Sequence, residues 1–178
     1  MELEVDLDEA PVERVTDFDP FFLDHFPKVA RAAAFVTRDA GVGQELAQEA
    51  FVQLLQRWPS MGSADHARNF VYKVAINLAR SHLRKHGRVF LYGLRGPDVP
   101  GRGSATNPSD DWLSMLEALG TLSPRQRACV VLVDYVDMAS ADAAAVLGMS
   151  PNTVRVHLMR GRQALRKDLA IVAEEDPS

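Results

Sequence analysis

The chain has 178 residues, 47% of which are hydrophobic, and a formal net charge of −4, so it can bury one medium-sized core or two small ones. It contains neither an apolar run long enough to span a membrane nor a start in which basic residues precede an apolar stretch, so we expect a cytoplasmic protein without membrane insertion. Its single cysteine, Cys129, excludes an internal disulfide bond and a cysteine-rich zinc site, and its apolar neighbours predict a buried structural thiol.

The charge is distributed unevenly along the chain. Residues 1–20 contain eight acidic residues and one basic residue, and three further acidic residues stand at 174–176. The rest of the chain is therefore basic, although the whole is acidic. We predict that residues 1–17 form an acidic, poorly ordered arm that lowers non-specific binding to DNA by repelling its phosphates, and that residues 174–178 form an acidic tail.

A first helix is predicted from Asp19 onward, because apolar residues recur there at helical spacing. Pro27 lies inside this segment and removes an internal hydrogen bond. We therefore expect either a kinked helix or two helices end to end.

A second helix is predicted from about Val42 to Trp58, with a start that Gly41 and Gly43 loosen. Its apolar residues share one face, which predicts a core contact. The opposite face carries Glu45, Gln48, Glu49, Val52 and Gln56. This second face is either solvated or a docking surface for a partner, and the pattern leaves both alternatives open.

A third, strongly basic helix is predicted from about Ala64 to Arg88. One continuous stripe on it consists of residues spaced i, i+4, i+7, i+11 and i+15. These residues are Lys73, Asn77, Arg80, Arg84 and Arg88. A long basic stripe that includes an asparagine suits a phosphate backbone and an exposed base. His82 and His86 have a spacing that could bind a metal, but no third ligand is near in sequence, so we expect solvated histidines and no metal site.

Residues 89–111 are interrupted throughout by glycine and proline, which predicts a flexible linker and a domain boundary. After it, a short amphipathic helix is predicted over residues 112–119. Ser123 and Gln126 have the spacing of a capping box, so a further helix is predicted over residues 124–136. The apolar run inside that helix also has strand propensity, so its prediction depends on the cap.

Residues 138–169 are predicted to form two helices joined by a tight turn. Gly148 can take the left-handed conformation at the end of the first helix, and Ser150 can cap the second. The second helix has a narrow apolar sector and a basic opposite side, so it is either a helix that fits the major groove of DNA or an ordinary amphipathic helix with a solvated side. The residues predicted to face the groove are Asn152, Thr153, Arg155, Val156, Met159 and Arg160. Residues expected to meet phosphates or a protein partner are Arg162, Arg166 and Lys167.

Three parts of the chain together resemble the extracytoplasmic-function (ECF) group of bacterial RNA polymerase sigma factors. Residues 48–52 resemble that family's Gln-Glu-x-Phe segment, and residues 70–79 resemble its Trp-Leu-Tyr-x-Ile-Ala-x-Asn helix, with Phe70 in place of tryptophan. Residues 122–127 and 147–158 resemble its last region. Each segment alone is a weak signal, but their order and spacing are specific.

The resemblance implies an all-α fold of two small helical domains: sigma region 2 at residues 18–88 and a sigma region 4 helix-turn-helix at residues 112–173, joined by the linker. It implies that the polar face of the second helix binds the clamp of the largest subunit of core RNA polymerase, and that region 4 binds the flap of the second-largest subunit. The basic stripe, with the loop at residues 60–66, would bind and help to melt the minus-ten element of promoter DNA. The helix-turn-helix would read the minus-thirty-five element, and an anti-sigma factor is implied as a further partner.

No catalytic or nucleotide-binding motif is present in the sequence, so we expect neither enzymatic activity nor a cofactor. Two alternatives to a sigma factor belong to other classes. The first is a LuxR-type transcriptional regulator, because residues 150–157 also resemble that recognition helix; the helical, basic character of residues 18–88 argues against the α/β sensory domain that it would need. The second is a helical interaction module that does not bind polymerase, which would leave the basic stripe unexplained.

Overall fold

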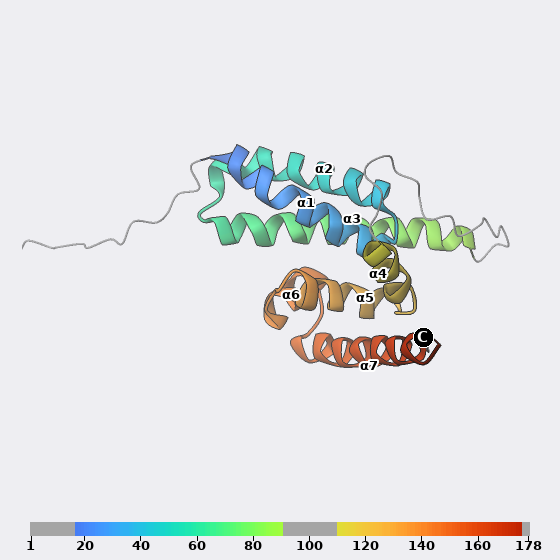
Figure 1. Cartoon of the computed structure of the whole chain (residues 1–178). Helices are drawn as coiled ribbons and strands as arrows, with labels where there is room; N and C mark the ends of the chain where they lie inside the picture. Colours follow the sequence, from blue (N-terminus) through green and yellow to red (C-terminus); the bar gives the residue numbers. More distant parts are fainter. Residues whose placement is uncertain (1–16, 91–109, 176–178) are drawn as a thin grey trace, which may run out of the picture.

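The computed structural model describes residues 17–90 and 110–175, except for the side chains of 87–90, 110–111 and 168–175, and every regular element in these ranges is a helix. Figure 1 shows the helices in three layers. The upper layer contains α1 (Phe18–Thr37), α2 (Ala40–Arg57) and α3 (Ala64–Phe90), the middle layer α4 (Asp110–Gly120), α5 (Pro124–Val130) and α6 (Ser140–Leu147), and the lower layer α7 (Pro151–Glu175). The all-α class is therefore confirmed, while the predicted acidic arm, most of the linker and the end of the acidic tail lie outside the described residues.

The upper layer is the N-terminal block. α1 is a single helix that continues through Pro27, so the alternative of two separate helices was wrong. α2 starts at Ala40, because the Asp39 carboxylate accepts a hydrogen bond from the Val42 amide at 2.9 Å. A Cβ on Gly43 would lie 2.6 Å from Ala34 Cβ, so this glycine allows α1 and α2 to touch. The expectation that it loosens the helix was wrong, because close packing and a cap hold the first turn.

The middle and lower layers form the C-terminal block. The capping box is confirmed: the Ser123 hydroxyl accepts from the Gln126 amide, and the Gln126 side chain accepts from the Ser123 amide. α5 continues as the π-helix η2 (Val131–Tyr135), so the helix predicted here is confirmed in spite of its β-branched residues. The helices also extend into both ends of the predicted linker, since α3 ends at Phe90 and α4 begins at Asp110.

The predicted helix-turn-helix is confirmed as α6 and α7. Gly148 ends α6 with φ of 63°, and the Ser150 hydroxyl accepts from the Thr153 amide at 3.1 Å. Val154 and Leu158 are buried on the predicted apolar sector of α7. A Cβ on Gly161 would lie 2.8 Å from Val130 Cγ2, so α7 packs closely against α5 at this glycine.

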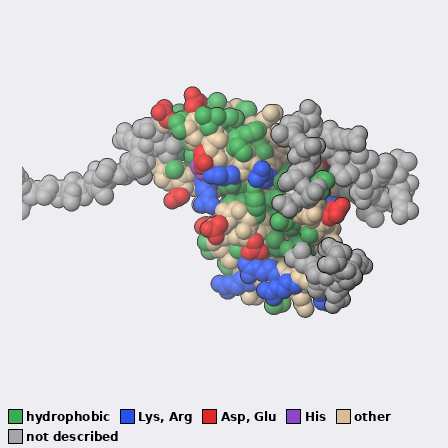
Figure 2. All heavy atoms as spheres, viewed as in Figure 1, with side chains coloured by type: hydrophobic (Ala, Val, Ile, Leu, Met, Phe, Trp, Pro, Cys, Tyr) green, Lys and Arg blue, Asp and Glu red, His purple; other side chains and the backbone are tan. Residues whose placement is uncertain are grey.

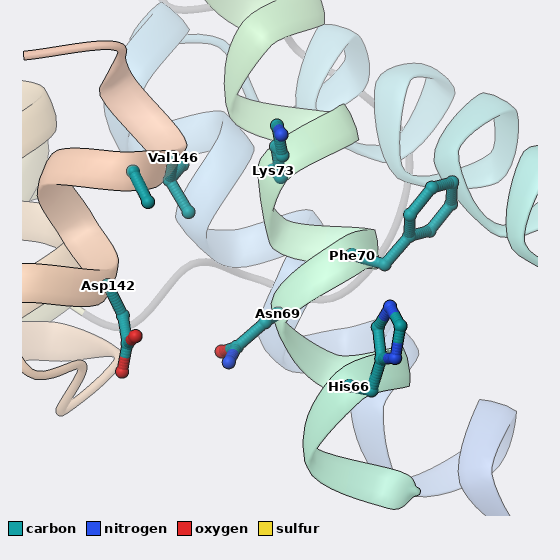
Figure 3. A pocket seen from close by; sticks show the side chains of 7 residues that line it. His66, Asn69, Phe70, Lys73, Asp142 and Val146 are labelled. Carbon is teal, nitrogen blue, oxygen red and sulfur yellow. The ribbon is translucent and has the colours of Figure 1, made fainter. Parts of the chain in front are cut away.

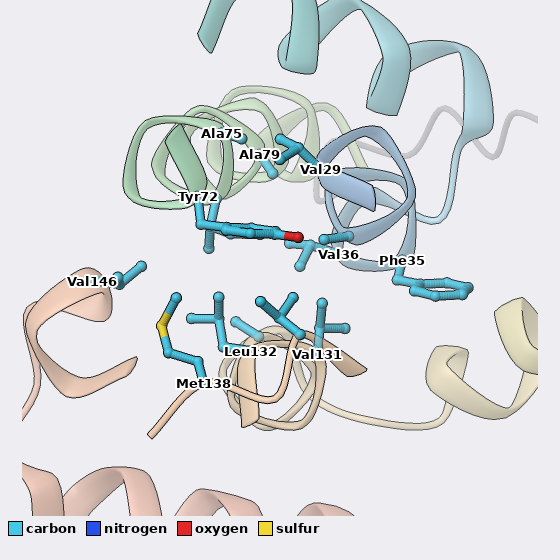
Figure 4. Close-up of a cluster of buried hydrophobic side chains, with 14 of the residues drawn as sticks. Val29, Phe35, Val36, Tyr72, Ala75, Ala79, Val131, Leu132, Met138 and Val146 are labelled. Carbon is cyan, nitrogen blue, oxygen red and sulfur yellow. The ribbon is translucent and has the colours of Figure 1, made fainter. Parts of the chain in front are cut away.

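The two blocks are packed on each other and share one hydrophobic core, an arrangement that the sequence pattern did not predict. Figure 4 shows Tyr72 of α3 lying between the blocks, above Leu132 and Met138 of the C-terminal block. Tyr72 is only 3% exposed, and its burial raises the pKa of its hydroxyl to about 12. We call this contact between the N-terminal and C-terminal blocks the block interface.

Candidate nucleic-acid and polymerase interfaces

The first candidate surface is the predicted groove face of α7. Asn152, Thr153, Arg155, Met159 and Arg160 are exposed there, and Val156 is half-buried. Figure 2 shows Lys and Arg side chains gathered along the lower edge of the molecule, where α7 lies. The Thr153 hydroxyl lies 2.7 Å from the Ser150 hydroxyl, so this side chain also takes part in the cap. The remaining side chains are free to meet a groove.

Arg162 lies on the same helix but is already engaged. Its guanidinium donates two hydrogen bonds to the Asp134 carboxylate of η2, and this contact raises the pKa of Arg162. In this structure Arg162 joins α7 to η2, and its expected contact with phosphates or a partner stays a prediction. Arg166 and Lys167 remain exposed.

The second candidate surface is the basic stripe of α3. Lys73, Asn77 and Arg84 are exposed, as predicted. Arg80 is half-buried in the block interface, where its Nη1 donates to the Leu147 carbonyl at 2.9 Å and to Asn77 Oδ1 at 3.4 Å. Burial, followed by the nearby charges of Arg84 and Arg125, lowers the pKa of Arg80. Because Arg80 is engaged, the exposed stripe is interrupted at its centre. The side chain of Arg88, at the end of the stripe, lies outside the described residues.

A pocket of about 230 Å³ lies where the stripe meets α6 (Figure 3). Lys73 and Asn69 of α3 and Asp142 of α6 are among its lining residues. In Figure 3 the side chains of Asn69 and Asp142 point toward each other across this pocket. The beginning of α3 and the helix-turn-helix are therefore neighbours, although they are far apart in sequence.

The third candidate surface is the polar face of α2. Its five predicted residues are all exposed, and its two glutamates make no ion pair within the part of the chain that the structure describes. Leu55, which the sequence analysis did not include, is 52% exposed and lies three residues after Val52, which is 55% exposed. The spacing of these two apolar residues could have revealed this ridge. The face therefore combines acidic, amide and apolar groups, as a protein-docking surface does.

Arg127 is a further residue whose role the sequence did not reveal. It is 6% exposed and donates to the carbonyls of Leu119, Leu122 and Val36 at 2.8, 3.0 and 3.0 Å. Burial, with a smaller contribution from the charge of Arg38, lowers its pKa to about 10, so it stays charged at neutral pH. It joins α1 to the C-terminal block.

The cysteine and the histidine pair were considered in the sequence as possible reactive or metal-binding groups. Cys129 is buried as predicted, and burial raises the pKa of its thiol to about 11, which disfavours the reactive thiolate. His82 and His86 stack with their ring centroids 4.1 Å apart, and within the described residues no third possible ligand completes a metal site. No helix of the described part is both long and apolar enough to cross a membrane.

Comparison with known families identifies the class of protein. The model of Sigma-70 region 2 matches residues 21–89, and the model of Sigma-70 region 4 matches residues 112–165. The two matched segments coincide with the N-terminal block and with most of the C-terminal block. The chain therefore belongs to the sigma-70 family of promoter-recognition factors. The LuxR alternative is not supported, because a sigma region occupies the segment where a sensory domain would lie.

The similar proteins place the chain in the ECF group of that family. It is 28% identical over 155 residues to the sigma factor CarQ of Myxococcus xanthus, with 84% of this chain and 87% of CarQ covered. It is 28% identical to the sigma-E factor of Streptomyces coelicolor, with 87% of each chain covered. The fold is similar to that of the sigma factor RpoE in a complex with the anti-sigma factor NepR from Bartonella quintana, with 22% identity, a TM-score of 0.72, and coverage of 88% of this chain and 99% of that one.

Proposed function

We propose that this sigma factor binds core RNA polymerase through α2 and the C-terminal block, and directs it to promoters through two separate DNA-binding surfaces. The observation that carries the proposal is that one chain presents basic side chains on both α3 and α7, each in a different matched sigma region. Two such surfaces fit two promoter elements. Neither role requires catalysis by the chain. Because core RNA polymerase works in the cytoplasm, a protein that binds it is expected there too.

The polar face of α2 is proposed to dock on the clamp of the largest polymerase subunit. Val52 and Leu55 supply exposed apolar area, and Glu45 and Glu49 supply charges that are free for a basic partner. Interfaces of this kind combine an apolar centre with a polar rim. The C-terminal block is proposed to bind the flap of the second-largest subunit.

The stripe of α3, with the loop at residues 60–66, is proposed to bind the minus-ten element in its opened form. Lys73 and Arg84 would neutralise phosphates, and Asn77 can donate to or accept from a base edge. A base that leaves the stack costs a few kcal/mol, which contacts of this kind would offset. Melting would therefore be coupled to binding at this surface.

The groove face of α7 is proposed to read the minus-thirty-five element. Arg155 and Arg160 can each donate two hydrogen bonds to a guanine edge, and Val156 and Met159 can contact thymine methyl groups. Arg166, on another side of the helix, is better placed for phosphate or polymerase than for bases.

A protein inhibitor is a proposed further partner. The sigma factors RpoE and CnrH, to which the fold is similar, were solved in complexes with NepR and with the cytosolic domain of CnrY. We propose an anti-sigma factor for this chain that competes with polymerase for the exposed face of α2.

The test is co-purification of the chain with core polymerase, sequencing of the bound DNA, and transcription in vitro from the promoters recovered. The double variant Arg155→Ala/Arg160→Ala should keep polymerase binding and lose promoter selection. The matched control is Arg166→Ala on the same helix, which should keep promoter selection because Arg166 does not face the bases. Failure of the unmodified chain to bind core polymerase would end the proposal.

A further inference from the structure

Three arginine side chains, two from the N-terminal block and one from the C-terminal block, gather at one place on the block interface. Arg80 and Arg84 are one turn apart on α3, so they share a side of that helix. Arg125 belongs to α5 and is exposed, as Arg84 is. We call these three residues the arginine cluster.

The members of the arginine cluster are close neighbours, because their charges act on one another. The pKa of Arg80 is lowered by burial and, next, by the positive charges of Arg84 and Arg125. Cys129, one turn after Arg125 on the same helix, also lies within electrostatic range of Arg80. Arg80 itself reaches the other block, where its Nη1 donates to the Leu147 carbonyl at 2.9 Å. The cluster is therefore assembled by the packing of α3 on the C-terminal block.

No carboxylate balances the charge of the arginine cluster within the part of the chain that the structure describes. The ion pairs found there involve other residues, and the charges that act on Arg80 include no acidic side chain of Asp or Glu. Like charges that are held together repel, and water screens this repulsion less where one of the groups is half-buried. An anion placed between the guanidinium groups would relieve the repulsion.

Arg80 has donors left for such an anion. Its Nη1 bonds to the Leu147 carbonyl and to the Asn77 side chain, both of which are neutral. Its Nε and Nη2 make no hydrogen bond with the described residues, and neither atom is sealed from solvent. A guanidinium presents its N–H groups in a planar fork that matches two oxygens of a phosphate. Forks that come together from two helices suit a group with oxygens on several neighbouring phosphorus atoms.

We propose that the arginine cluster binds a small oligophosphate, such as the triphosphate group of a nucleotide, and that the bound anion joins α3 to α5. A DNA strand carries one charge per nucleotide along an extended backbone, whereas an oligophosphate concentrates its charges at one point, as the cluster does. The site goes beyond the promoter binding proposed above, because Arg125 belongs to neither DNA-binding surface. Arg80 and Arg84 also belong to the stripe, so an oligophosphate competes there with DNA if the proposed role of the stripe holds.

The experiment titrates the full chain with inorganic triphosphate, in a calorimeter, at about 0.15 M salt and without divalent cations. Arg125→Met removes one guanidinium from the cluster and nothing from the stripe. Arg57→Met is the matched control, because Arg57 is also an exposed arginine and lies outside the cluster and both DNA-binding surfaces. Fluorescence anisotropy with a labelled single strand of about 15 nucleotides measures DNA binding by the same variants. Circular dichroism checks that helix content is kept.

Arg125→Met should bind triphosphate about tenfold more weakly, since a charge-assisted hydrogen bond is lost, and should keep its affinity for the single strand. Arg57→Met should change neither affinity. Triphosphate should also raise the midpoint of thermal unfolding of the unmodified chain, and raise it less in Arg125→Met, because the cluster exists only in the folded, packed chain. Absence of triphosphate binding, or equal losses in the two variants, would overturn the proposal.

Two further comparisons identify the source of the phosphates and separate this site from the stripe. A ribonucleoside triphosphate that binds more tightly than inorganic triphosphate indicates a nucleotide ligand, and equal affinities indicate that only the phosphates are recognised; either result supports the site. If Arg125→Met lost DNA binding as well, Arg125 would be part of the DNA path, which contradicts a separate anion site. A chain that binds triphosphate but not the single strand would instead refute the DNA role of the stripe and leave the anion site intact.

Discussion

The two basic helices of this sigma factor differ in how much of their DNA-binding surface is free. α7 packs on the C-terminal block by the side that carries Val154 and Leu158, and its groove face is exposed. α3 packs on two sides, against the N-terminal block and against α6, so that Arg80 of its stripe is engaged. Two helices with similar charge patterns thus differ in how many basic side chains they can offer to DNA, because neighbouring helices cover part of α3.

The largest expected effect concerns Arg127, which joins α1 to the C-terminal block. Arg127→Met would remove the side-chain donor from the carbonyls of Leu119, Leu122 and Val36, of which Leu119 still accepts from the Leu122 amide at 3.3 Å. A carbonyl left without a donor costs about 1–3 kcal/mol, partly offset because a buried charge is removed. We expect a loss of about 3 kcal/mol in the free energy of unfolding, measured by urea denaturation. Arg125→Met, two residues earlier and exposed, is the control and should change little; equal losses in the two variants would contradict this role.

The groove face of α7 should respond strongly to single substitutions, since no other part of the described chain covers it. Arg155→Ala and Arg160→Ala are each expected to weaken binding to a duplex minus-thirty-five element by about 1–3 kcal/mol and to relax selection at one base pair. Binding titrations against single-base variants of the recovered promoter measure this effect. Unchanged selection in both variants would mean that α7 meets phosphates only.

The block interface should weaken at high pH through Tyr72. Its pKa is about 12 in the folded chain, against an ordinary value of 10, so the unfolded chain loses this proton first. The stability that depends on this group is fully present below pH 10 and falls between pH 10 and 12, by up to about 2 kcal/mol. Urea denaturation across that range should show the fall, and Tyr72→Phe should reduce it. A Tyr72→Phe variant with the same pH dependence would place the cause elsewhere.

The smallest expected effect compares two neighbours on the stripe of α3. Arg84→Ala should lower the affinity for single-stranded DNA by about 1 kcal/mol and reduce the salt slope of binding, because one phosphate contact is lost. Arg80→Ala should have a smaller net effect on this affinity. It removes a DNA contact, but it also removes the hydrogen bond to the Leu147 carbonyl that holds α6 against the stripe. Anisotropy titrations at several salt concentrations measure both. Equal losses in the two variants would indicate that Arg80 is as available as Arg84.

Some elements could be predicted because their signals are local. The capping box of Ser123 and Gln126 placed a helix where strand propensity was high, and Gly148 with Ser150 predicted the turn between α6 and α7. In each case the interacting residues are within four positions in sequence, so a short stretch of sequence contains all the residues that determine the local structure. The candidate faces of α2 and α7 followed from helical periodicity for the same reason.

The sequence by itself determined the helices, their apolar faces, the two sigma regions and the residues exposed on α2 and α7. Only the tertiary structure decided that the blocks share a core, that Gly43 brings α1 and α2 together, and that Arg80 and Arg127 reach the carbonyls of Leu147 and Val36. Helices and faces follow from neighbours three or four positions apart. The carbonyl acceptors belong to the backbone and have no side-chain signature, and the arginines that reach them are distant in sequence, so their pairing depends on how the completed helices pack.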